Sequence, residues 1–229
     1  MPTYRFESRL EAAEKIFEIL PVSQMQDEDW VLLALSLDAV SITDYISRKS
    51  SLDYDILFNE PIFAPNNPSC IIAIVSENEE VVIQEALVES FGINLDFIYG
   101  EAKRKYEESI LKNIYKYRKG SSLPLLTGRK VLLIDDGCES GMRAMVSLKT
   151  VIAEYVKSAS FAAPIMAQNT ALMLDNETDG LFCFSRVANF VSTDFYYKTK
   201  EEDLNCDEIL KILESSKHYI SFQKSQGDE

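Results

Sequence analysis

The chain has 229 residues, of which 46% are hydrophobic and 26% are charged. This balance is typical of a globular protein with its own apolar core. The net charge of −14 argues against a general nucleic-acid-binding protein and against a basic membrane-surface protein. No apolar run is long enough to span a bilayer, and the first residues lack the apolar centre of a signal peptide. We therefore expect a cytoplasmic protein without nucleic-acid or membrane partners.

Cysteine and histidine residues are few and widely spaced. The four cysteines form no CxxC pair, and the one histidine, His218, stands late in the sequence. This spacing argues against a zinc site and favours reduced thiols. It also argues against catalysis that depends on a histidine base.

The first predicted elements are a helix, a strand, a second helix and a second strand. The first helix is predicted over residues 6–20, because its apolar positions recur at helical spacing. These positions are Phe6, Leu10, Ala13, Phe17 and Leu20. Short apolar runs predict strands over 30–35 and 54–58, on either side of a helix over 39–48.

The middle of the chain combines a predicted loop, two strands and a long helix. Three prolines between residues 61 and 68 predict the loop. Two apolar runs, over 70–75 and 80–83, predict strands joined by a polar turn. Apolar residues at helical spacing predict a helix over 95–117, which ends before Gly120.

The most strand-like run of the chain is 131–134, which is apolar on both faces, as a central parallel strand should be. The helix after it is expected to bury a face made of Met145, Leu148, Ile152 and Tyr155. The remaining predicted elements are a strand over 160–165, a helix over 168–175, a strand over 181–184, a helix over 204–215 and a polar, frayed tail over 223–229. This alternation predicts an α/β fold with a mostly parallel central sheet and helices on both faces.

Two acids stand directly after the run 131–134, at the strand end where parallel α/β sheets bind ligands. Asp135 and Asp136 can accept hydrogen bonds from the vicinal hydroxyls of a sugar, or meet a magnesium ion. The alternative is a structural turn in which the two acids cap the following helix.

The residues after the acid pair form a candidate phosphate loop that opens a helix. Gly137 and Gly141 permit a tight turn and a close approach to a ligand, and the amides at a helix start attract an anion. Ser140 adds a hydroxyl donor, and the guanidinium of Arg143 can hold a phosphate at two points. With the acid pair, these residues predict a sugar-phosphate site. The candidate loop comprises Gly137, Cys138, Glu139, Ser140, Gly141, Met142 and Arg143.

The segment 131–143, with its four apolar residues, two acids and short loop, resembles the motif that binds 5-phosphoribosyl 1-diphosphate (PRPP) in type I phosphoribosyltransferases. The resemblance spans about residues 6–200 and extends to a subgroup of predicted phosphoribosyltransferases. Its other motifs here are the spacing of Phe6, Arg9 and Ala12, the loop 64–68, the helix end 117–120 and the strand end 163–167.

The resemblance implies Mg²⁺-dependent transfer of a 5-phosphoribosyl group from PRPP to a base or small nucleophile. Asp135 and Asp136 would then hold the ribose hydroxyls and Mg²⁺, the ion directly or through water or ligand, and the loop 137–143 would hold the 5-phosphate. The resemblance also implies a flexible segment over the site, here cationic and including Arg104, Arg118 and Lys119. The alternative is a solvated helix face in which Lys103 and Arg104 pair with Glu107 and Glu108 at i, i+4 spacing. A small hood over the base would contribute Phe195, Tyr196 and Tyr197, unless these rings cover the core instead.

The same resemblance implies a phosphoribosyltransferase-like domain over residues 1–205, made of the core and the hood. Residues 206–229 would form a C-terminal helix and a polar tail. Type I relatives are often dimers, so a homodimer is expected.

The sequence departs from the family pattern in the expected pyrophosphate loop, which here reads Ser36, Leu37, Asp38 and Ala39. An arginine of the pattern has become Leu37, and a glycine has become Asp38, whose charge would repel a diphosphate. An Arg-Lys pair of the pattern is replaced by Phe58 and Asn59.

Two functional hypotheses follow from these residues. One is a phosphoribosyltransferase with altered substrate use. The other is a non-catalytic protein of the same fold that binds a nucleoside monophosphate or another nucleotide, or a partner, in a regulatory role. Receiver domains also place an acid pair after an apolar strand, but their phospho-accepting Asp has no counterpart at Ser185 and Arg186, after the run 181–184.

Overall fold

The computed structural model describes residues 4–199 and 206–223. Its larger sheet has five strands in the order β2-β1-β6-β7-β8, and every neighbouring pair is parallel. The strands are β1 (Val31–Ala34), β2 (Tyr54–Ile56), β6 (Lys130–Ile134), β7 (Ser158–Ala167) and β8 (Gly180–Val187). The α/β fold predicted from the sequence is therefore confirmed, with β6, the predicted central strand, in the middle of the sheet.

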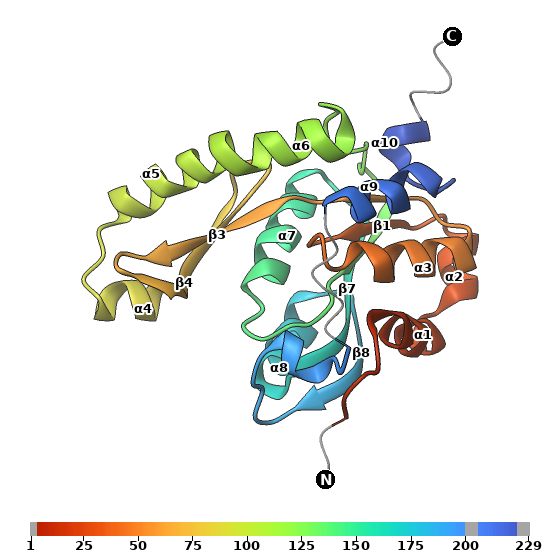
Figure 1. The fold of residues 1–229 in the computed structure, drawn as a ribbon, viewed down its shortest axis with the longest axis horizontal. Helices are drawn as coiled ribbons and strands as arrows, with labels where there is room; N and C mark the ends of the chain where they lie inside the picture. The colour runs from red at the N-terminus through yellow and green to blue at the C-terminus, as the bar shows by residue number, and fades with distance from the viewer. Residues whose placement is uncertain (1–3, 200–205, 224–229) are drawn as a thin grey trace.

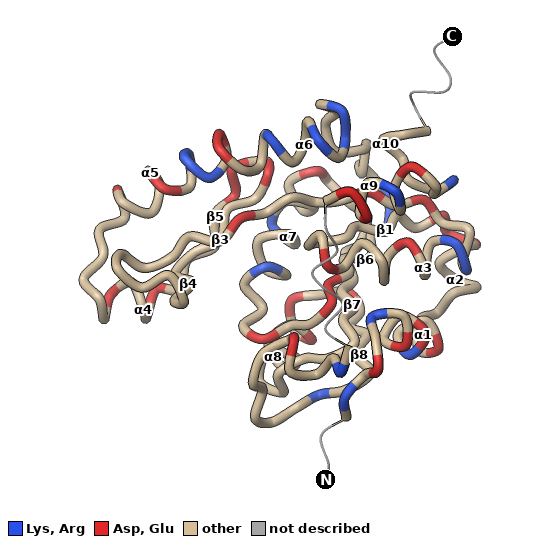
Figure 2. Tube along the Cα trace, in the orientation of Figure 1, with Lys and Arg blue, Asp and Glu red and all other residues tan. Residues whose placement is uncertain are grey.

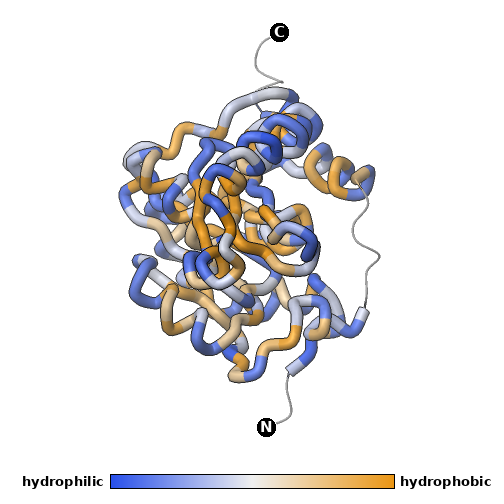
Figure 3. The backbone as a smooth tube through the Cα atoms, turned by 90° about the vertical axis from the view of Figure 1, so that its left-hand side faces the viewer, coloured by the Kyte–Doolittle hydropathy of each residue, from blue (hydrophilic) through white to orange (hydrophobic). Residues whose placement is uncertain are grey.

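Helices cover both faces of this sheet. The helices of the body are α1 (Arg9–Ile19), α2 (Val22–Asp27), α3 (Val40–Ser50), α7 (Met142–Ala153), α8 (Gln168–Glu177), α9 (Cys206–Ser215) and α10 (Ile220–Gln223). Side chains of β6 alternate between two apolar cores: Leu132 lies in the core with α1 and α3, and Leu133 in the core with α7. Because both faces of these strands are buried, their sequences are continuous apolar runs. Figure 3 shows these hydrophobic segments in the interior of the molecule.

A second, antiparallel sheet and a long helix project from the body as an arm, defined here as residues 59–118 (Figure 1). The sheet contains β3 (Asn59–Ala64), β4 (Asn67–Ser76) and β5 (Val81–Ile83) in the order β3-β4-β5. The helical part consists of α4 (Glu85–Ser90), α5 (Leu95–Lys105), a π-helical turn η1 (Tyr106–Ile110) and α6 (Leu111–Arg118). The helix predicted over 95–117 is therefore confirmed, with a π-helical turn in its middle.

The prediction of a loop over residues 61–68 is wrong, because this segment forms the hairpin between β3 and β4. The structure tolerates Pro61 since β3 is an edge strand, and an edge strand can lack one ladder donor. Asn66 takes the left-handed conformation (φ 64°) that the tight connection requires.

Two predicted helix faces are also partly wrong. Leu10 on α1 is 55% exposed, because α1 instead buries Ala12, Ala13 and Ile16. Ile152 is 59% exposed at the end of α7, which packs against both the sheet and the arm and therefore buries a broader set of residues than one stripe.

Acidic and basic residues stand in successive groups along the arm helix, with acids on the first part of α5 and on η1, and bases on the last turn of α5 and on α6 (Figure 2). Arg104 pairs with Glu101 and Glu108, so its charge is neutralised locally. The C-terminal helices pack onto the body, with α9 against α3 and α10 against β2. Residues 204–205 of the predicted last helix, and the predicted tail from 224 on, lie outside the described residues. Within 4–199 and 206–223, none of the helices has the length and apolar character that crossing a membrane requires.

Candidate functional site

Asp135 and Asp136 follow β6 directly and are almost fully buried, at 3% and 6% exposure. The Asp135 carboxylate accepts a hydrogen bond from Ser36 Oγ at 2.8 Å and pairs with Arg143 Nη1 at 3.1 Å. Asp135 is thereby held between the turn after β1 and the first turn of α7.

Asp136 is held by the N-terminal helix. Arg9 Nη2 lies 3.1 Å from Asp136 Oδ2 and 3.5 Å from Asp38 Oδ1, and its guanidinium stacks over the Tyr197 ring at 5.2 Å. Burial and the neighbouring Asp135 charge raise the pKa of Asp136, and the Arg9 guanidinium opposes this shift. Arg9 is therefore the first group among those that favour the ionised form of this buried carboxyl.

The turn after the acid pair is tightly packed and leads into α7. An added Cβ at Gly137 would lie 2.6 Å from the Thr193 side chain, so only glycine fits beneath this segment. Gly141 is the N-cap of α7 with φ 76°, a conformation that favours glycine. A cavity of about 170 Å³ opens here, lined among others by Asp135, Ser140 and Arg143. A helix start beside a small polar cavity suits an anion such as a phosphate group.

Two members of the predicted phosphate loop have other roles in the structure. Arg143 is committed to the protein: besides Asp135 it donates from Nε to Asn59 Oδ1 at 3.1 Å. Cys138 is buried, its amide donates to the Ile165 carbonyl, and burial raises the pKa of its thiol well above the usual range. Cys138 is therefore a packing residue, whereas Glu139 and Ser140 are exposed beside the cavity.

The predicted pyrophosphate loop connects β1 to α3 and lies against the acid pair. Ser36 Oγ accepts from the Ala39 amide at 3.1 Å while it donates to Asp135, so it ties the two loops together. Leu37 packs against the core, and Asp38 pairs with Arg9. The structure thus brings residues 36–39 and 135–143 together, as the resemblance implied.

The predicted hood residues differ in their exposure. Tyr196 is fully buried, and Tyr197, 3% exposed, donates its hydroxyl to the Asp136 carbonyl at 2.6 Å. Both rings are therefore part of the core and cannot stack on a base. Phe195 is 41% exposed and lies beneath the Arg5 guanidinium at 4.8 Å, so of the three it alone presents its ring to a ligand.

The predicted flexible cationic segment is corrected by the structure. Arg104 and Arg118 lie in the continuous helix of the arm, and Lys119 caps its end with φ 52°. Arg118 is fully buried and forms ion pairs with Glu77 and Asp55, so it is unavailable to a ligand. None of the three lines the cavity at the start of α7.

The sequence analysis did not assign a role in the site to two residues, Arg9 and Asn59, that contact its charged groups. Arg9 lies 127 positions before Asp136 in the sequence, and only its place in the N-terminal motif hinted at a role. Asn59 orients Arg143 while donating to the Leu35 carbonyl at 2.8 Å, a role that the sequence did not signal.

The side chains of this site suit a metal ion that binds together with a substrate better than a metal ion that the protein holds permanently. Three carboxyl groups, of Asp38, Asp135 and Asp136, face two guanidinium groups, so the formal charge of the cluster with all three ionised is −1. Among the described residues no group of three or more His, Cys, Asp or Glu side chains is arranged to hold a metal. Mg²⁺ is commonly held by one or two carboxylates together with phosphate oxygens of a substrate, which Asp135 or Asp136 could provide.

Comparisons with known proteins find relatives that are named phosphoribosyl transferases. Two Mycobacterium tuberculosis proteins, each named "Putative phosphoribosyl transferase", are 21% identical over 210 residues, which cover 91% of this chain. The chain spans 46% of the length of these curated relatives. The sequence resemblance to phosphoribosyltransferases is thereby confirmed, although no protein-family model matches the chain.

A solved structure shows the same fold. The crystal structure of TT1426 from Thermus thermophilus superposes with a TM-score of 0.73 at 23% identity. The match covers 91% of this chain and 97% of that one, so it includes the arm as well as the body.

Proposed function

We propose that the chain is a phosphoribosyltransferase that binds PRPP with Mg²⁺ at the turn between β6 and α7. The observation that carries this proposal is the buried acid pair, of which Asp135 lines a cavity at the start of α7. The relatives named as phosphoribosyl transferases support the same reaction class.

Each part of the turn has a chemical role in this proposal. The carboxylates of Asp135 and Asp136 accept hydrogen bonds from the ribose hydroxyls through their Oδ2 atoms, each of which is paired with a single guanidinium and keeps a lone pair. The 5-phosphate lies against Ser140 and the first amides of α7. Mg²⁺, when bound with the substrate, neutralises charge on the leaving diphosphate.

Catalysis at such a site depends on position and electrostatics. Transfer passes through an oxocarbenium-like state at the anomeric carbon, and the buried carboxylates stabilise that positive charge in a site of low dielectric. Arg9 and Arg143 hold the two carboxylates in fixed positions before substrate arrives, which reduces the reorganisation that the reaction requires.

A second candidate function is supported by the position and exposure of Asp38. Asp38 is 44% exposed at its side chain and stands where the resemblance implies a diphosphate. Two like unit charges about 4 Å apart repel by about 4 kcal/mol at an effective dielectric near 20. This repulsion favours a ligand with one phosphate, such as a nucleoside monophosphate, bound without turnover.

Thermal-shift titrations with PRPP, ribose 5-phosphate, a nucleoside monophosphate and pyrophosphate, each with and without Mg²⁺, test the shared site. We expect PRPP with Mg²⁺ to raise the melting temperature. Ser140→Asp should abolish this rise because it adds a negative charge at the exposed mouth of the cavity. Ser140→Asn, which has nearly the same shape and no charge, is the matched control and should retain most of it.

Two outcomes separate the candidates. Release of pyrophosphate from PRPP in the presence of a base supports the transferase and rejects the binding-only protein. A shift with the nucleoside monophosphate but none with millimolar PRPP rejects the transferase. Absence of any shift with all four ligands rejects both.

A further inference from the structure

A second, larger cavity lies between the arm and the body, at the opposite end of α7 from the candidate site. Its volume is about 420 Å³, within the range of small-molecule sites. Thr150 and Glu154, at the C-terminal end of α7, line it, whereas the candidate site borders the first residues of the same helix. Since α7 has 12 residues, the two sites are separated by roughly 18 Å of helix.

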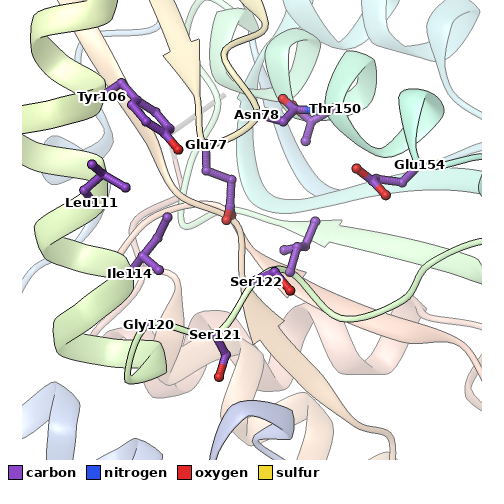
Figure 4. Close-up of a pocket in the computed structure, with 11 residues that line it drawn as sticks. Glu77, Asn78, Tyr106, Leu111, Ile114, Gly120, Ser121, Ser122, Thr150 and Glu154 are labelled. Carbon is purple, nitrogen blue, oxygen red and sulfur yellow. The ribbon is translucent and has the colours of Figure 1, made fainter.

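One wall of this cavity is apolar and comes from the arm. Leu111 and Ile114 lie on this side together with Tyr106 (Figure 4). Tyr106 begins the π-helical turn η1 and Leu111 follows it, so the widened turn shapes this wall. Such turns are frequent at functional sites.

The other walls carry oxygen acceptors. In Figure 4 the Glu77 carboxyl group lies between the arm helix and Glu154, and Glu154 extends toward it from the opposite side. Glu77 is paired with Arg118 and accepts from the Phe58 amide, so its charge is largely compensated. The Glu154 carboxylate has no ion pair among the described residues, and it is therefore the main negative charge of the cavity.

The lining of this cavity contains no Lys, Arg or His among the described residues. A phosphate or carboxylate ligand would find no Lys, Arg or His among the lining residues, whereas an ammonium group would find the Glu154 carboxylate and several hydroxyl oxygens. The apolar wall suits a hydrocarbon chain attached to that ammonium.

We propose that this cavity is a binding site for a small organic amine, with the ammonium group on Glu154 and the hydrocarbon part against Leu111 and Ile114. The site is distinct from the turn after β6, and amine binding does not depend on a phosphoribosyl ligand.

Calorimetric titration of the full chain with four pentyl compounds tests this proposal. Pentylamine and 1,5-diaminopentane carry the cation, pentanol is the neutral analogue and pentanoate the anionic one. We expect the amines to bind about tenfold or more tightly than pentanol, as a net charge-assisted hydrogen bond predicts, and pentanoate not to bind. Equal affinity for amine and alcohol, or no binding of either amine at millimolar concentration, overturns the proposal.

Variants locate the binding in the cavity. Glu154→Gln keeps the shape and removes the charge, so amine affinity should fall about tenfold or more. Ser122→Trp at the exposed mouth should exclude the amines sterically. Glu177→Gln, an equivalent change at an exposed position on α8, is the control and should leave binding unchanged. Unchanged binding in Glu154→Gln would place the amine elsewhere and reject the assignment.

Discussion

Arg9 is the residue on which the charge state of the site depends most directly. Its guanidinium is the partner of the buried Asp136 carboxylate, and it comes from a helix that contributes no other charge to the site. Removal of one partner of a buried ion pair leaves the other charge uncompensated, which is more costly than loss of both.

We expect Arg9→Met to destabilise the protein by about 3–5 kcal/mol at pH above ~8. Without Arg9, burial raises the pKa of Asp136 further. A carboxyl group whose folded-state pKa is raised favours folding while it is protonated, and this contribution is lost as pH rises through the folded pKa. Urea unfolding should therefore show a smaller loss at pH near ~5 than at ~8.

The double variant Arg9→Met, Asp136→Asn is the control for this interpretation. It removes both charges, so it should recover part of the stability and should lose most of the difference between pH ~5 and pH ~8. If the single variant shows the same deficit at both pH values, Arg9 contributes by packing and not by its charge.

The four cysteines differ in reactivity for reasons that are also local. Hydrogen bonds with Lys116 and Tyr117 lower the pKa of the exposed Cys206 thiol, whereas burial raises that of Cys138. We expect iodoacetamide at neutral pH to modify Cys206 roughly tenfold or more faster than Cys138. Peptide mass mapping measures both rates in one sample. Lys116→Met should slow the reaction at Cys206 only, and equal rates at the two thiols would contradict the prediction.

At the scale of elements, the turn between β6 and α7 is fixed by its contact with the segment that follows β8. Gly137→Ala would place a methyl group 2.6 Å from the Thr193 side chain. We expect a destabilisation of about 1–3 kcal/mol, as for other overpacked sites, and weaker ligand binding at the turn. Thr193→Ala in the same chain should relieve most of the loss, and chemical denaturation of the single and double variants checks this. Full stability of Gly137→Ala alone would show that the segment moves freely.

The elements that the sequence predicted well are those whose burial is uniform. The parallel strands are covered on both faces, so β1 and β6 appear as plain apolar runs. The β3–β4 hairpin was missed because prolines normally interrupt strands, and an edge position is a property of the whole sheet that a local pattern does not contain. The exposed Leu10 and Ile152 were misplaced because α1 and α7 each pack against more than one neighbour.

The candidate site was predictable to the extent that it is local in sequence. The acid pair, the glycines and the helix start are contiguous, and they lie together as expected. Arg9 and Asn59 could not be derived, because an ion pair across 127 positions and a hydrogen bond across 84 positions depend on the tertiary fold. The same fold buries Tyr196, Tyr197 and Arg118, which the family resemblance implied as ligand contacts.

At the scale of the whole molecule, a buried polar cluster joins the arm, the sheet edge and the C-terminal segment. Arg118 from the arm pairs with Glu77 and lies 4.0 Å from Asp55 on β2. Asp55 also accepts a hydrogen bond from Ser221 at 2.8 Å, and burial raises its pKa to about 6. Arg118 thus compensates two carboxylates from different parts of the chain.

We expect Arg118→Met to loosen the arm and the C-terminal helix together, with a loss of about 3–5 kcal/mol for the uncompensated acids. Hydrogen exchange should increase in both α6 and α10. The triple variant Arg118→Met, Glu77→Gln, Asp55→Asn removes all three charges and should restore much of the protection. Increased exchange confined to α6 would show that the cluster does not link the two regions.

The N-terminal strand-like segment has a practical consequence for shortened forms of the protein. The Phe6 amide donates to the Tyr196 carbonyl at 2.7 Å, and the Phe6 carbonyl accepts from the Lys198 amide at 2.8 Å, three residues before Arg9 enters the acid pair. Deletion of the first ten residues would therefore expose the aromatic side chains behind the turn. The same deletion would remove Arg9, the counter-ion of Asp136. A truncated preparation that failed to bind ligand would say nothing about the intact chain.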